Sequence, residues 1–136
     1  QDVALDVDRS GLLLEVAALL KSPRTIFVLV TRPEPERIPE TLFFARRLRE
    51  AGYRVGPVLV NMCHPLAPAT PGRDDDEEGW RLMSWLAERD ARGLEAYRAR
   101  LGGHPLVDVP LVAEEPADLA SLDRLRAHLV ERWCPV

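Results

Sequence analysis

Two short apolar runs of strand-forming residues each end at polar residues, and a segment of helix length separates them. The first run occupies residues 25–31 and leads into Arg32, and the second occupies residues 57–62 and carries Asn61 near its end. The first run is apolar on both faces, as expected of a buried parallel strand. The pattern predicts a right-handed βαβ unit. Because ligands bind at the carboxyl ends of strands in open α/β sheets, polar residues at those ends are the first candidates for a site.

Helix and turn signals give the order of the other elements. Pro39 suits the first turn of a helix between the two strands, and Gly52 suits its end. Acidic residues 74–78 open a long helix that ends at Gly102. The expected helices are 12–20, 39–51, 74–101 and 119–133, and the expected strands are 25–31, 57–62 and 106–109.

This order predicts one α/β domain over residues 1–136, with a three-layer arrangement of a parallel sheet and flanking helices. Residues 1–9 are expected to be weakly structured, and residues 63–76 to form a long mobile loop. Helical spacing on the last helix predicts an inward face formed by Leu119, Leu122, Leu125, Leu129 and Trp133.

Composition excludes several classes of protein. The chain has 136 residues, 46% of them hydrophobic, which predicts a globular domain. Its net charge of −4 argues against a nucleic-acid partner. The two cysteines form no CxxC pair, and no apolar run approaches the ~20 residues of a membrane span, so a cytoplasmic protein is expected. The chain begins with Gln1, which suggests a segment of something longer.

Four short segments, taken in their order and spacing, resemble the carboxyl-terminal half of the ArsA-type anion-transporting ATPases. They are residues 27–34, 40–41, 60–61 and 109–111. This family includes the arsenite-pump ATPase and the eukaryotic ATPase that targets tail-anchored membrane proteins. The resemblance covers about residues 12–133. It implies part of a doubly wound P-loop NTPase fold of the deviant-Walker type, with ATP and Mg as cofactors and a nucleotide-gated dimer as the working form.

The resemblance also implies roles for individual residues. Asn61 matches the asparagine that recognises the base. Pro110, Leu111 and Val112 match the start of the loop that lines the adenine. Glu34 matches the acidic residue that reaches toward nucleotide across the dimer. From the residues alone, Asn61 also suits a strand cap and Glu34 a solvated turn, so both interpretations stay open.

The chain departs from the family at three places. It has no GxxxxGK[ST] loop, since Glu15 and Leu20 stand where Lys21-Ser22 would require glycines. No catalytic residue is therefore assigned, and this chain alone should not hydrolyse ATP. The 63–76 loop lacks the CxxC pair of the targeting branch, so no zinc or other metal is expected. The loop after Pro110 is more acidic than the family version.

The leading hypothesis is that the chain supplies the adenine-binding wall of an ArsA-like ATPase. Its expected partners are an upstream P-loop half of the same protein, a second copy or pseudo-repeat, and a membrane pump or client protein. The alternative is a degenerate α/β module for protein interaction or dimerisation, without nucleotide. A flavodoxin-like binder of small molecules is a third, weaker hypothesis, because no strand is followed by a phosphate loop.

Overall fold

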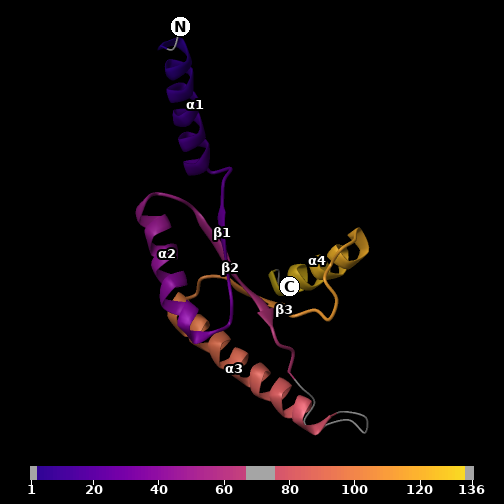
Figure 1. Ribbon diagram of the computed structural model, residues 1–136. Helices are drawn as coiled ribbons and strands as arrows, with labels where there is room; N and C mark the ends of the chain where they lie inside the picture. The colour runs from indigo at the N-terminus through magenta and orange to yellow at the C-terminus, as the bar shows by residue number, and fades with distance from the viewer. Residues whose placement is uncertain (1–2, 67–75, 134–136) are drawn as a thin grey trace.

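The structure is a computed structural model that describes the backbone of residues 3–66 and 76–133 and the side chains of residues 11–66 and 76–130. The elements are α1 Val3–Lys21, β1 Phe27–Thr31, η1 Pro35–Arg37, α2 Ile38–Glu50, β2 Val55–Cys63, α3 Glu77–Leu101, β3 Leu106–Pro110 and α4 Leu119–Trp133 (Figure 1). The three strands are parallel and lie in the order β1-β2-β3. The predicted α/β class and parallel sheet are therefore confirmed.

The sheet lies between α2 and α3 on one side and α4 on the other (Figure 1). Its core is on the α2 and α3 side. There Val58 and Val60 of the central strand β2 are fully buried and pack with Ile38, Tyr97 and Leu101. On the other side, α4 contacts β3. The central strand is therefore buried on the α2 and α3 side, whereas on the α4 side β3 is buried and β1 is exposed.

The strand β1 forms an open edge of the sheet among the described residues. Side chains alternate along a strand, so Leu29 faces the core while Val28 and Val30 face the other way. Val28 is 38% exposed and Val30 is 63% exposed. The expectation that this strand is buried on both faces is wrong for the chain as it stands, because nothing in its described part covers the second face of β1.

The helix α1 extends away from the sheet (Figure 1). Its described side chains are exposed, including the apolar residues Leu12, Leu13, Leu14, Val16, Leu19 and Leu20. The helix begins at Val3, so the expectation of weak structure over residues 1–9 is wrong for residues 3–9. The helix continues through Gly11 because one glycine in a helix interior costs only about 1 kcal/mol relative to alanine.

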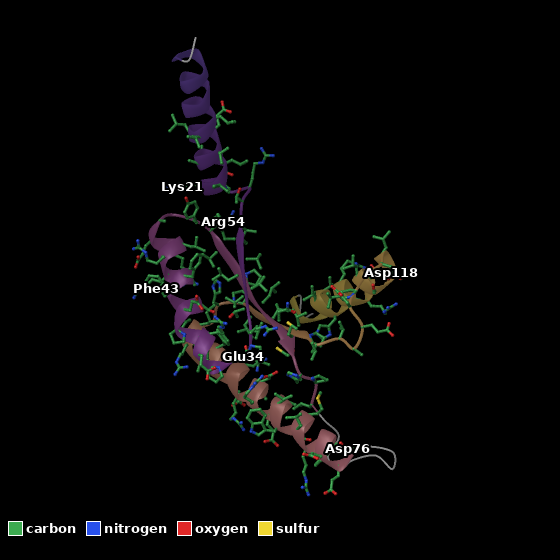
Figure 2. All side chains as sticks on the ribbon, viewed as in Figure 1. Lys21, Glu34, Phe43, Arg54, Asp76 and Asp118 are labelled. Atoms are coloured by element: carbon green, nitrogen blue, oxygen red, sulfur yellow. The ribbon has the colours of Figure 1, made fainter. Side chains whose placement is uncertain are left out.

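The carboxyl end of α3 follows the sequence signal, whereas the first residue of the helix is Glu77 and not residue 74 as expected. Asp76 caps its amino terminus, where its side chain accepts a hydrogen bond of 3.0 Å from the Gly79 amide (Figure 2). Gly102 ends the helix with φ of 58°, a conformation that favours glycine. The expected loop at 63–76 is shorter at its start, because β2 continues to Cys63. The mobility expected of its centre, residues 67–75, lies outside the described residues.

The inward face predicted for α4 is only partly correct. Leu125 and Leu129 are half-buried, but Leu119 is 86% exposed and Leu122 is 48% exposed. The expectation fails at these two residues because α4 packs on β3, and a strand of five residues is too short to cover the whole apolar face of a 15-residue helix. The side chain of Trp133 lies outside the described residues.

A close backbone contact joins the end of β1 to α3. A Cβ atom at Gly93 would lie 1.8 Å from the carbonyl oxygen of Pro33 and 2.9 Å from its carbonyl carbon. Pro33 itself is fully buried. Only glycine at position 93 permits this approach, which places the loop after β1 directly on α3.

We expect Gly93→Ala to destabilise the protein by about 3 kcal/mol or more, because a backbone atom cannot move aside as a flexible side chain can. Gly11→Ala is the matched control, since a Cβ there meets nothing within 4 Å. It should leave stability unchanged or slightly raised. Urea unfolding measures both variants. A Gly93→Ala protein as stable as wild type would contradict the contact.

Candidate functional site

The carboxyl ends of the three strands meet at one edge of the sheet. Thr31 pairs with Val60, Val60 pairs with Asp108, and Cys63 pairs with Pro110. The loops that follow the strands therefore leave the sheet side by side. All five residues predicted for the nucleotide site lie in or beside these loops.

Asn61 lies in a bulge at the end of β2. The pairing register with β3 shifts between Val60 and Cys63, and Met62 has a φ of 61°. The Asn61 side-chain oxygen accepts a hydrogen bond of 2.9 Å from the Met62 amide. Asn61 therefore does cap its own turn. An amide side chain offers two donors and two acceptor lone pairs, so this bond uses only part of its capacity.

The loop after β3 is joined directly to the end of β2. The Leu111 amide donates a hydrogen bond of 2.7 Å to the Cys63 carbonyl oxygen. Beyond this bond, a cavity of about 410 Å³ separates the loop from α4. Pro110, Val112, Glu114, Arg124 and His128 are among the residues that line it, and Asn61 is not. The structure thus brings the Asn61 segment beside the loop but places the Asn61 side chain outside this cavity.

Glu34 lies beside α3 just after β1 (Figure 2). Its Oε1 atom is 4.0 Å from Arg32 Nη1 and 4.0 Å from Arg89 Nη2. Its Oε2 atom is buried and has no hydrogen-bond partner among the described residues. A buried acceptor without a partner costs about 1–3 kcal/mol. Glu34 is therefore more than a solvated turn residue, although the buried Oε2 atom itself presents no surface to a ligand.

A buried carboxylate, which we did not predict from the sequence, lies next to these residues. Asp90 of α3 is 1% exposed. Its Oδ2 atom accepts bonds of 2.9 Å from the His64 amide and 2.7 Å from His64 Nδ1. Its Oδ1 atom accepts bonds of 3.0 Å and 2.7 Å from Arg89 Nε and Nη2. Both oxygens are thus satisfied, one by His64 directly after β2 and the other by the Arg89 guanidinium that faces Glu34.

The electrostatics of Asp90 follow from these bonds. Burial by itself would raise the pKa of its carboxyl, but the hydrogen bonds from His64 and Arg89 outweigh it and lower the pKa below the usual value. A sequence signal for this residue exists. Asp90 falls on the apolar stripe of Ala87, Leu94 and Tyr97, where a carboxylate must find partners.

Cys63 does not act as a reactive thiol here. Burial, together with the negative charges of Asp108 and Asp90, raises the pKa of its thiol to about 12. Its Sγ atom lies 3.2 Å from the Val60 carbonyl oxygen. A protonated, buried thiol is neither a good nucleophile nor a metal ligand. Within residues 11–66 and 76–130, whose side chains the structure describes, no group of three His, Cys, Asp or Glu side chains is arranged to hold a metal ion.

Three hydroxyl groups form a hydrogen-bonded cluster at the end of β1. Thr31 Oγ1 lies 2.9 Å from Tyr97 OH and 2.9 Å from Thr41 Oγ1, and the latter two hydroxyls are 3.2 Å apart. Tyr97 is fully buried and Thr41 is 8% exposed. This cluster joins β1, α2 and α3. We assign it a structural role, because its hydroxyls bond one another.

Comparison with models of protein families finds no match to this chain, and comparison with curated proteins finds none either. The ArsA-like interpretation therefore stays a prediction that rests on the residues named above. No helix in the described part of the chain is both long and apolar enough to cross a lipid bilayer.

The low pKa of Asp90 predicts a pH dependence of stability. A carboxyl whose pKa is lower in the fold adds stability above its unfolded pKa of about 3.9, and that stability is lost as pH falls through the folded pKa. Asp90→Asn should remove this dependence below about pH 4 and should cost about 2 kcal/mol at pH 7. Asp123→Asn, at a residue whose side chain is 67% exposed, is the control. Urea unfolding at several pH values measures all three proteins, and equal pH profiles for Asp90→Asn and wild type would contradict the assignment.

Proposed function

We propose that this chain is the carboxyl-terminal part of an ArsA-like protein that binds and hydrolyses ATP in the cytoplasm. In this proposal it supplies the wall that holds the adenine, and the phosphates and Mg are bound by a P-loop half of the same protein. The whole protein works as a dimer or pseudo-dimer that drives anion transport or protein targeting. One observation carries the proposal: the Leu111–Cys63 hydrogen bond holds the loop after β3 beside the segment that bears Asn61.

The chemistry of these groups suits an adenine nucleotide. The base presents both a donor and an acceptor on one edge, and an asparagine amide can meet both at once. The carboxylate of Glu34, whose side chain is 30% exposed, is an acceptor suited to a hydroxyl group. The site also occupies the carboxyl ends of parallel strands, where α/β proteins bind ligands. In this proposal the residues of the chain bind and orient the base, and the chemistry of the phosphates belongs to the other half.

The uncovered edge and exposed face of β1 support a P-loop half of the same protein as the partner. The outer edge of β1 presents backbone N–H and C=O groups without a neighbouring strand in the described chain. Parallel strands occur almost only in sheets with both faces covered. The exposure of Val28 and Val30 therefore favours a further strand and its covering helix at this edge. A P-loop half would supply both.

Asn61→Ala in the natural full-length protein tests the proposal. We expect affinity for ATP to fall about tenfold and the preference for ATP over GTP to be largely lost, because one donor–acceptor pair to the base disappears. Folding should be unchanged. Glu88→Gln on α3, with a side chain that is 69% exposed, is the control. Calorimetric titration with each nucleotide measures the effect, and unchanged affinity with unchanged preference would remove Asn61 from the site.

The second candidate function is a protein-interaction or dimerisation module without nucleotide. The observation that favours it is the same open edge, together with the exposed leucines of α1. An edge of uncharged strand residues readily pairs with another chain. In this alternative, the edge of β1 is covered by a second polypeptide rather than by another part of the same one.

Val30→Lys separates the two candidates. If a P-loop half of the same chain covers β1, the buried charge should lower the stability of the natural protein by about 1–3 kcal/mol without changing its number of protomers. Leu119→Lys, at a residue that is 86% exposed, is the control. Sedimentation velocity and urea unfolding give the two readouts. Dissociation of Val30→Lys into folded subunits would favour the dimerisation module.

A further inference from the structure

The loops after the three strands are joined through one side chain of α3. Asp90 bonds both the amide and the imidazole Nδ1 of His64, the first residue after β2. Three residues earlier, Asn61 lies in the bulge at the end of the same strand. Since the bulge breaks the regular pairing with β3, the position of Asn61 depends on how the following residues are held.

Through His64, Asp90 also holds the loop after β3. The residue before His64 is Cys63, whose carbonyl oxygen accepts the 2.7 Å bond from the Leu111 amide. Fixing His64 on α3 therefore fixes the acceptor that holds the predicted adenine loop. Two hydrogen bonds and one peptide unit separate Asp90 from Leu111.

The other oxygen of Asp90 is directed to the loop after β1. It accepts two bonds from Arg89, and Arg89 Nη2 lies 4.0 Å from Glu34 Oε1. The Arg89 guanidinium also lies over the Trp85 ring, at 5.6 Å from its centroid. These contacts hold the charge of Arg89 next to Glu34 rather than in solvent.

We infer that Asp90 is a positioning residue of the base-binding site, which sets Asn61 and Leu111 through His64 and sets Glu34 through Arg89. The inference rests on the proposed function, because the site it organises is the proposed adenine wall. Asp90 touches no ligand in this role. It affects nucleotide binding through the positions of the three loops.

The test compares Asp90→Asn with Tyr97→Phe in the natural full-length protein. The asparagine keeps the size of the side chain but turns an NH₂ group toward donors of His64 or Arg89. Tyr97→Phe is the matched control, because it removes another buried polar group of the same helix that bonds Thr31 and Thr41 instead. His64→Ala is a milder second variant, since it removes the Nδ1 bond and keeps the bond from the His64 amide.

Two readouts are needed, hydrogen exchange at the Leu111 amide and the ratio of ATP to GTP affinity. In Asp90→Asn we expect exchange at Leu111 to be at least tenfold faster and the ATP preference to fall about tenfold. His64→Ala should show smaller changes in the same direction, and Tyr97→Phe should show neither. Changes in Tyr97→Phe equal to those in Asp90→Asn would reduce Asp90 to a stabilising residue and overturn the inference.

The result for the wild-type protein separates the two proposals. A wild-type protein that binds no ATP would overturn the proposed function and, with it, the positioning role. A wild-type protein that prefers ATP, with an Asp90→Asn variant that keeps this preference, would overturn the positioning role alone. If Asp90→Asn fails to fold, the same comparison between His64→Ala and Tyr97→Phe decides the inference.

Discussion

The hydrogen bonds of one buried carboxylate, Asp90, hold together the end of the molecule that carries every candidate site residue. A charged group with 1% exposure is tolerated only when its oxygens are bonded, and here four N–H donors from His64 and Arg89 satisfy them. Because the donors come from the segment after β2 and from the arginine beside Glu34, satisfying the carboxylate also orders the loops. The contact of Pro33 with Gly93, one turn further along α3, fixes the first of these loops in the same way.

A second constraint acts on the sheet as a whole. Parallel strands carry apolar side chains on both faces, and the described chain covers only one face of β1. The exposed valines of β1 and the exposed leucines of α1 lie on elements that are consecutive in the sequence. Both candidate functions therefore require a covering surface at the same edge, and they differ in whether one polypeptide or two provide it.

Local signals in the sequence were sufficient for the fold class and for the order of α1–α4 and β1–β3. Several boundaries differ, since β1 begins at Phe27 rather than residue 25, β2 spans Val55–Cys63 rather than 57–62, and α3 begins at Glu77 rather than residue 74. Pro39 lies in the first turn of α2 and Gly102 ends α3 because these residues act through their own backbone. The sequence predicted that Leu119 faces inward, but this residue is exposed. Helical spacing identifies the apolar face of α4 but not how much of that face β3 covers. The site was predictable only in part. Asp90 and His64 are 26 residues apart, and their bond depends on where α3 crosses the sheet.

The measurement that tests the central claim most directly is photolabelling of the natural full-length protein with 8-azido-ATP, followed by mapping of the labelled peptides. If the ends of β2 and β3 form the adenine wall, the label should fall on residues 61–64 and 110–113 and should be competed by ATP more strongly than by GTP. Specific labelling elsewhere in the protein, or none, would contradict the claim that this chain holds the base.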